Sequence, residues 1–274
     1  MTTAHRLHDT TDALRRELAE AKDVLGRSRI EDQHYFLDQA LGRYLWGAAA
    51  IADSALALAM ARKAAGADAL IRQLHEALID VSFILSSPDP DLCAAQSALK
   101  DLLDWRELWG LHAQVVRTNP DYPFPPIPDA WQAVLGQHVA ANVDALDKVC
   151  SDLGGPPDLF TRAKAVLDAS GRWHWSGMSR HQMITELTRR GELQEAGAAI
   201  ALTVTKLYNV GSHASPSWSV LAVDIKDERA IHSFPDPSSS DDDDLVRLAS
   251  TASHFLSGIR AAVSTRILPP RGDA

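Results

Sequence analysis

Apolar positions recur every three or four residues along most of the chain, the spacing typical of amphipathic helices. In the first helix Leu14, Leu18, Ala21 and Leu25 follow this spacing after a Thr-rich start. The runs end at Gly or Pro and begin at residues that cap helices, such as Asp89 before Pro90. Eight more helices are predicted at about 31–65, 67–86, 89–117, 130–153, 158–169, 179–191, 193–212 and 245–268. We therefore expect an all-α, multi-helix bundle of about nine helices.

Two segments interrupt the helical pattern. Segment 118–129 holds five prolines and cannot be a helix or a central strand. It is predicted to be a stiff connector between an N-terminal helical half, 1–117, and a C-terminal half, 130–274, of a single domain 1–274. Segment 219–234 has short β-prone runs around a charged turn at 225–229 and can form a short β-hairpin.

Composition narrows the classes of partner. The 274 residues are 46% hydrophobic and 23% charged, as in an ordinary globular protein with a large core. The net charge of −9 disfavours a general nucleic-acid binder, because phosphate affinity comes from clustered Lys and Arg. An RNA partner stays open but is not favoured. An unknown small molecule or protein is the expected partner, and the chain can also assemble as a homo-oligomer.

The N-terminus, the most apolar stretch and the cysteines indicate the cellular compartment of the protein. The N-terminus has no apolar signal region, and the stretch 45–60 is mostly Ala, contains Asp53 and is shorter than the roughly 20 residues of a membrane span. Cys93 and Cys150 are too few for a disulfide framework or a zinc site. We expect a cytoplasmic protein with reduced thiols, no membrane contact, no metal and no cofactor.

The helix at 67–86 carries the first candidate site. Arg72 and Glu76 lie one turn apart, beside Ile79 and Phe83 and opposite a second apolar stripe. A helix that is apolar on two faces is central, so this ion pair would be at least partly removed from water. The alternative is a surface pair beside residues that dip under a loop. The opposite stripe consists of Leu70, Leu74, Leu78, Val81 and Leu85.

The helix at 193–212 carries the second candidate site. Lys206, Asn209 and His213 fall on one side, away from the apolar stripe, if the helix persists to His213. The segment Ala214-Ser215-Pro216 follows, so His213 stands at a helix C-terminus, where the helix dipole favours its protonation. A capping role that satisfies terminal carbonyls is the alternative.

The third candidate is the aromatic loop 172–178, which contains Trp173 and Trp175 between two helices. Tryptophan buries a large area, and its indole N–H needs a partner. The loop can be a plug that seals helix ends. Ligand or base stacking is the alternative, and it needs an exposed ring face.

Three phrases resemble a known family. Ile71-Arg72-Gln73-Leu74-His75-Glu76-Ala77, Trp175-Ser176-Gly177-Met178-Ser179-Arg180 and Tyr208 through His213-Ala214-Ser215-Pro216 are similar to an uncharacterised bacterial helical family, domain of unknown function 5677. The resemblance covers about residues 48–216. It implies a bacterial helical protein and no known activity, because the family has none assigned.

More distantly, the chain resembles the HEPN helical group, in which some members are metal-independent ribonucleases. Those enzymes use an Arg and a His with four to six residues between them, whereas Lys206, Leu207 and Tyr208 stand seven, six and five residues before His213. Four Arg–His pairs at such spacing occur elsewhere in the chain, against about 2.4 expected by chance from 20 Arg and 11 His. The pattern therefore gives little support to a nuclease.

Two hypotheses follow. The first is a non-catalytic binding or regulatory module with one polar pocket, which requires the helices at 67–86 and 193–212 to pack side by side with the Trp loop closing one end. The second is a HEPN-like or toxin-type ribonuclease with His213 as base and Lys206 or Arg72 providing phosphate charge. A P-loop, a dinucleotide turn and a serine nucleophile elbow are missing from the sequence. The expected pocket residues are Arg72, Glu76, Trp175, Tyr208, Asn209 and His213.

Overall fold

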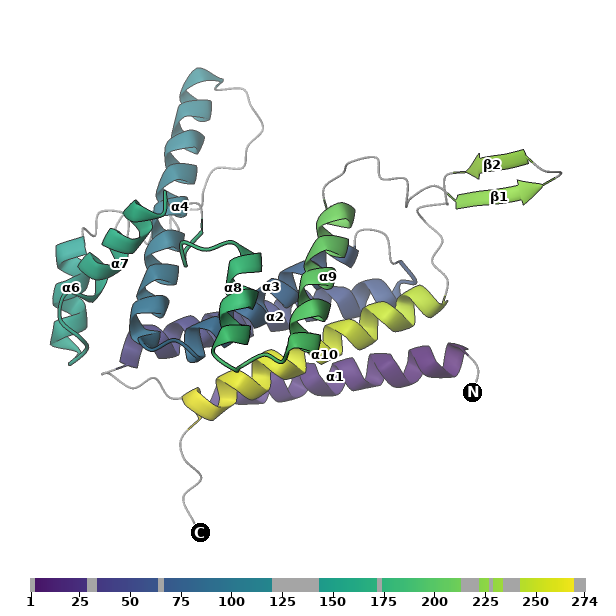
Figure 1. Ribbon diagram of the computed structural model, residues 1–274, viewed down its shortest axis with the longest axis horizontal. Helices are drawn as coiled ribbons and strands as arrows, with labels where there is room; N and C mark the ends of the chain where they lie inside the picture. The colour runs from purple at the N-terminus through teal and green to yellow at the C-terminus, as the bar shows by residue number, and fades with distance from the viewer. Residues whose placement is uncertain are drawn as a thin grey trace, which may run out of the picture. The chain divides into compact units, whose positions relative to one another are not determined.

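The computed structural model describes most of the chain, including nine helices and one two-stranded hairpin within the described residues (Figure 1). In the hairpin, and in the last helix turns from residue 206 to residue 212, only the backbone is described. The prediction of an all-α fold is confirmed. The described ranges are 3–28, 34–63, 67–119, 143–171, 174–212, 222–226, 229–233 and 242–268.

The helices fall close to the predicted positions. The segment expected to be helical at 31–65 forms a shorter helix, Tyr35–Met60. Of the segment expected to be helical at 130–153, the structure describes only the residues from 143 onward. The connector 118–129 lies outside the described residues apart from Thr118 and Asn119. The helices are α1 (Thr3–Arg27), α2 (Tyr35–Met60), α3 (Ala67–Leu85), α4 (Pro90–Thr118), α6 (Val143–Asp152), α7 (Leu159–Ala169), α8 (Arg180–Arg189), α9 (Glu195–Ser212) and α10 (Asp242–Ile267).

Local chemistry explains where helices begin and end. The Asp89 carboxylate accepts a hydrogen bond from the Leu92 N–H at 3.0 Å, with Pro90 in the first turn of α4, as predicted. After α8, Gly191 has φ of +79°, a left-handed conformation that glycine adopts without strain.

The hairpin lies within the predicted β-prone region. β1 (Ala222–Lys226) pairs antiparallel with β2 (Arg229–Ser233), from Ala222 opposite Ser233 to Lys226 opposite Arg229. Residues 225, 226 and 229 were expected to belong to the turn, but they are paired within the two strands.

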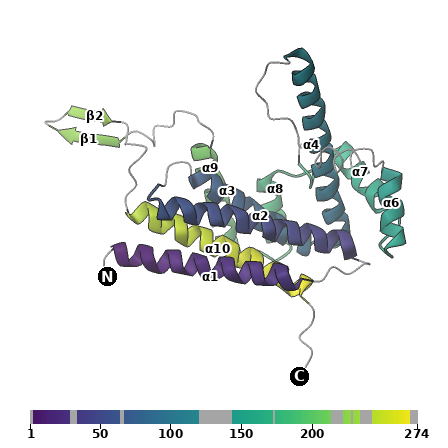
Figure 2. The ribbon, with the colours of Figure 1, turned by 180° about the vertical axis from the view of Figure 1, so that it is seen from behind.

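The contacts divide the chain into two compact units. Unit 1 is Met1–Arg29, Leu41–Ser86 and Arg180–Ala274, and unit 2 is Ile30–Ala40 and Ser87–Ser179. This grouping differs from the expected sequential halves, because α1 and α10, from opposite ends of the chain, pack side by side (Figure 2).

Unit 1 is built around α3, which packs against α8, α9 and α10. α10 in turn packs against α1, where Leu14, Leu18 and Ala21 of the predicted stripe are buried and Leu25 is partly buried. α2 has a buried face on which most residues are small. These buried residues of α2 in unit 1 are Leu41, Leu45, Ala48, Ala49, Ala52, Ala55 and Ala59.

Unit 2 has its own core between α4, α6 and α7. Asp147 of α6 is 9% exposed and accepts hydrogen bonds from the backbone N–H groups of Phe160 and Thr161, at 2.6 and 3.1 Å. It thereby caps the start of α7, where the side chain of Asp158 makes no capping bond. The buried core residues of unit 2 are Ala95, Leu99, Cys150, Leu159, Phe160, Ala163 and Leu167.

The structure bears on two of the sequence predictions, the reduced cysteines and the absence of a membrane span. Cys93 and Cys150 are both buried, and neither forms a disulfide in the described chain. Across the helices that the structure describes, none combines the length and apolar character that crossing a membrane requires.

Candidate functional site

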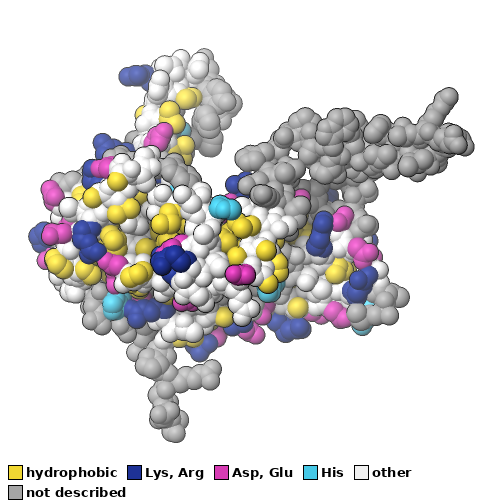
Figure 3. Space-filling model, viewed as in Figure 1, with side chains coloured by type: hydrophobic (Ala, Val, Ile, Leu, Met, Phe, Trp, Pro, Cys, Tyr) yellow, Lys and Arg dark blue, Asp and Glu magenta, His cyan; other side chains and the backbone are white. Residues whose placement is uncertain are grey.

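A cavity of about 650 Å³ lies inside unit 1, between α3, the end of α8, α9 and α10. We call it the bundle pocket. Its volume is within the range of small-molecule sites, about 300–1,000 Å³. Hydrophobic side chains gather over α8 and α9 on the face shown in Figure 3. The apolar residues that define the pocket include Leu78, Ile79, Leu187, Leu193, Ile200, Val204 and Phe255.

Small residues on α9 leave this space open. Gly197 and Ala201 lie one turn apart and both line the pocket. A Cβ atom at Gly197 would lie 3.0 Å from the Leu193 Cδ1 atom, so a larger residue would push against the pocket wall. Ile200, with 66% of its surface exposed, marks the side that opens to solvent.

His75 is the most deeply buried polar residue of the pocket lining. Only 4% of its surface is exposed, and its ring lies 5.3 Å from the Phe255 ring between centroids. Its ring nitrogens are not among the fully buried side-chain atoms that lack a partner in the described chain. The bundle pocket therefore has a largely buried imidazole in its wall.

Burial also sets the charge of His75. It lowers the pKa of the imidazole to about 4, with Glu76 opposing the shift and Arg180 adding to it. The ring is therefore neutral near pH 7, where it offers one N–H donor and one acceptor nitrogen.

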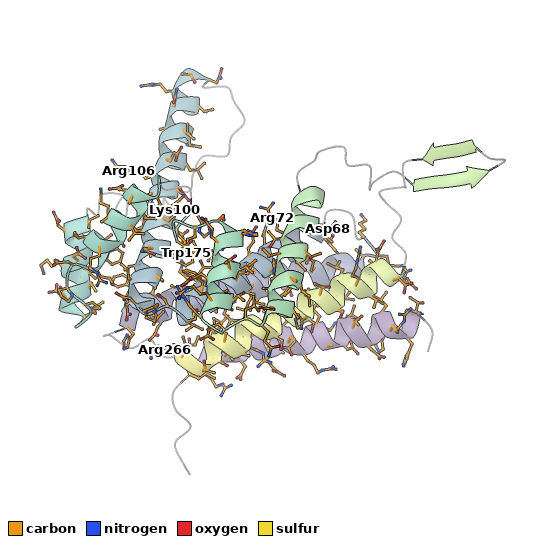
Figure 4. All side chains as sticks on the ribbon, in the orientation of Figure 1. Asp68, Arg72, Lys100, Arg106, Trp175 and Arg266 are labelled. Carbon is orange, nitrogen blue, oxygen red and sulfur yellow. The ribbon has the colours of Figure 1, made fainter. Side chains whose placement is uncertain are left out.

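The predicted Arg72 and Glu76 pair belongs to a larger ion cluster beside His75. Arg72 Nε donates to Glu76 Oε1 at 2.8 Å, and the two side chains are 28% and 26% exposed, so the pair is half-buried. Figure 4 shows Arg72 on α3, which packs against α9. Arg180 Nη2 lies 4.0 Å from the second Glu76 oxygen and extends the cluster to α8.

Arg180 and Asp80 form the most buried part of this cluster. Arg180 Nη2 donates to Asp80 Oδ2 at 2.9 Å, and Nη1 donates to the other carboxylate oxygen. Burial by itself would lower the pKa of Arg180, but the Asp80 and Glu76 carboxylates and Tyr44 outweigh burial and raise it. The guanidinium is thus held in its charged form.

The structure brings together only some of the predicted site residues. α3 and α9 pack against each other, as the single-pocket hypothesis requires. The described lining of the bundle pocket includes His75 but neither Arg72 nor Glu76. Lys206, Tyr208 and Asn209 fall where only the α9 backbone is described, and His213 lies outside the described residues. Their roles stay predictions.

Trp175 belongs to unit 2, so its expected place beside Arg72 of unit 1 also stays a prediction. It is 6% exposed, in a turn where the Ser176 N–H donates to His174 Nδ1 at 3.2 Å. Stacking on a base needs an exposed ring face, so this burial favours the interpretation of the loop as a structural plug. Arg172 and Trp173 lie outside the described residues.

Sequence reasoning missed His75, Asp80 and Arg180. A signal existed for Asp80, because Glu76 and Asp80 are four residues apart and two carboxylates on one face of a buried helix require a cation. Arg180 ends the phrase that begins at Trp175, but nothing in the sequence indicates that it lies beside α3.

Within the described ranges, no group of three or more His, Cys, Asp or Glu side chains could hold a metal ion. Comparison of the chain with protein-family models, curated proteins and solved structures finds no significant match in any of the three.

Proposed function

We propose that this protein is a non-catalytic helical binding module whose bundle pocket takes an apolar small molecule. The observation that carries the proposal is the cavity of about 650 Å³ with an apolar lining inside unit 1. Helix bundles commonly hold ligands between their helices, in sites lined by apolar side chains with a few polar groups. The cytoplasmic location and the relation to domain of unknown function 5677 and the HEPN group stay part of the proposal.

The described lining favours an apolar ligand over RNA. It contains neither Lys nor Arg, whereas a phosphate backbone is bound mainly through such side chains. The ribonuclease hypothesis depends on His213, outside the described chain, and gains no support from the pocket.

Ligand binding would also change the stability of the helix bundle, which is a means of regulation. Residues from α3, α8, α9 and α10 contribute to one cavity, so an occupant contacts all four helices at once. A ligand that binds only the folded protein stabilises it in proportion to the logarithm of its concentration above Kd. We infer that occupancy tightens the packing of these helices.

The test is a fluorescence titration with N-phenyl-1-naphthylamine, an uncharged apolar dye whose emission rises in apolar surroundings. Ala201→Trp fills the pocket, and Ala199→Trp places the same side chain on the exposed side of α9. We expect saturable binding to the wild type and to Ala199→Trp, and at least tenfold weaker binding to Ala201→Trp. Absence of binding to the wild type, or equal binding to both variants, would overturn the proposal.

A further inference from the structure

We infer that the ligand of the bundle pocket is uncharged and carries a hydroxyl or carbonyl group that hydrogen-bonds to His75. The inference rests on the proposed function and names the chemical class that the pocket selects. Two observations support the inference: His75 lies in the cavity wall, and the charged side chains near it, Arg180, Asp80 and Glu76, are paired with one another.

His75 provides the attractive part of the selection. It is 4% exposed and lines the cavity, and its ring nitrogens are not among the fully buried side-chain atoms that lack a partner in the described chain. A ligand hydroxyl or carbonyl group can form a hydrogen bond with the imidazole inside the cavity. A purely apolar ligand covers the ring nitrogens without offering a partner and so binds more weakly.

The surrounding charges disfavour an anionic ligand. Arg180, the cation that contributes to the lowered pKa of His75, is already bonded to Asp80 at two points and lies 4.0 Å from Glu76. The only charged residue of the described lining besides the histidines is Glu192, which is exposed and negative. A carboxylate in the pocket would therefore be buried without a counter-charge, which is costly.

A cationic ligand meets a different obstacle at the depth of His75. Burial disfavours a positive charge at His75 more strongly than the neighbouring Glu76 carboxylate favours one, so a cation there would lose its hydration without full compensation. The imidazole stays neutral over the physiological range, because burial lowers its pKa to about 4. The inner pocket thus favours a neutral group that can donate or accept one hydrogen bond.

The aromatic wall indicates probes of suitable shape. The Phe255 ring on α10 lies 5.3 Å from the His75 ring on α3 and 5.8 Å from the His254 ring on α10, between centroids. Flat aromatic molecules pack well against such rings. Naphthalene, 2-naphthol and 2-naphthoate share one ring system and differ only in the polar group, which isolates the contribution of that group.

The experiment measures displacement of N-phenyl-1-naphthylamine by these three compounds at pH 7. We expect 2-naphthol to bind about tenfold more tightly than naphthalene, the gain of one well-formed hydrogen bond. We expect 2-naphthoate to bind more weakly than naphthalene. His75→Leu should bind naphthalene as the wild type does and lose the preference for 2-naphthol. His181→Leu, at an exposed histidine of α8 that is not among the described lining residues, should keep that preference.

The outcomes separate the two claims. If 2-naphthoate binds best, or if His75→Leu keeps the tenfold preference, the inference is wrong while the pocket still binds apolar molecules. If the dye and naphthalene fail to bind the wild type, the proposed function itself is wrong. Wild-type protein labelled with ¹⁵N-histidine gives an independent readout that needs no variant: 2-naphthol should shift the His75 ring nitrogen signals without protonating the ring, and unchanged signals would contradict the inference.

Discussion

Arg180 and Asp80 form a two-point ion pair that joins the first turn of α8 to α3. The side chains are 18% and 7% exposed, so the pair is largely removed from water. Both helices contribute to the bundle pocket, through Leu187 on α8 and Ile79 on α3. The ion pair therefore holds two walls of the pocket in register.

Removal of Asp80 should be strongly destabilising. Asp80→Ala leaves the Arg180 guanidinium buried without its main partner, and such losses cost about 3–5 kcal/mol. Equilibrium unfolding in urea measures the free energy of unfolding. The matched control is Asp23→Ala, whose ion pair with Arg27 is 57% and 59% exposed and should contribute less than about 1 kcal/mol. Equal effects of the two variants would show that the Arg180 and Asp80 pair does not stabilise unit 1.

Glu76 should be coupled to Asp80 through Arg180. Glu76 lies 4.0 Å from the same guanidinium and is hydrogen-bonded to Arg72, but its side chain is 26% exposed. Glu76→Ala alone should therefore cost less than Asp80→Ala. Residues in one network give an interaction free energy of about 0.5–3 kcal/mol in a double-mutant cycle. The unfolding free energies of both single variants and the double variant measure it, and additivity within about 0.5 kcal/mol would exclude the network.

The sequence predicted the helices because apolar spacing and caps are local features. Asp89 before Pro90 marked the start of α4, and Leu14, Leu18 and Ala21 marked the buried face of α1. The grouping into two units was not predictable in this way. It depends on the packing of α1 against α10, a contact between the ends of the chain that leaves no local signal.

The candidate site was predictable only in part for the same reason. Arg72 and Glu76 are one turn apart, so their pairing follows from helix geometry alone. Arg180 is 100 residues from Asp80 along the chain, and only the packing of α8 on α3 brings them together. The bundle pocket arises where Gly197 and Ala201 leave space, whereas the sequence pattern indicated only that this helix face is apolar.

His75 should make the stability of the protein depend on pH. Its pKa is about 4 in the folded protein, below its ordinary value of 6.5, so the unfolded chain binds more protons between these values. The contribution is complete above about pH 6.5 and is lost as the pH falls through about 4. From pH 7 to pH 4.5 the wild type should lose about 2 kcal/mol more than His75→Leu. Urea unfolding of both proteins at the two pH values measures this difference, and parallel losses would contradict the burial of a neutral His75.

RNA should not be a substrate if the protein is a binding module. The net charge is −9, and the described lining of the pocket has neither Lys nor Arg. Mixed RNA incubated with the purified wild type should stay intact over hours, as should RNA incubated with His213→Ala. Cleavage by the wild type that disappears in His213→Ala would instead support the ribonuclease hypothesis.

The place where an apolar ligand binds can be observed directly by NMR. With 2-naphthol bound to methyl-labelled protein, we predict intermolecular nuclear Overhauser effects from the ligand protons to the methyl groups of Leu78, Leu193 and Val204, which line the bundle pocket. The control positions are Leu108 and Leu111 on α4 in unit 2, which are each 54% exposed and could hold an apolar ligand nonspecifically. Contacts confined to Leu108 and Leu111, or no intermolecular contacts at saturating ligand, would contradict the account.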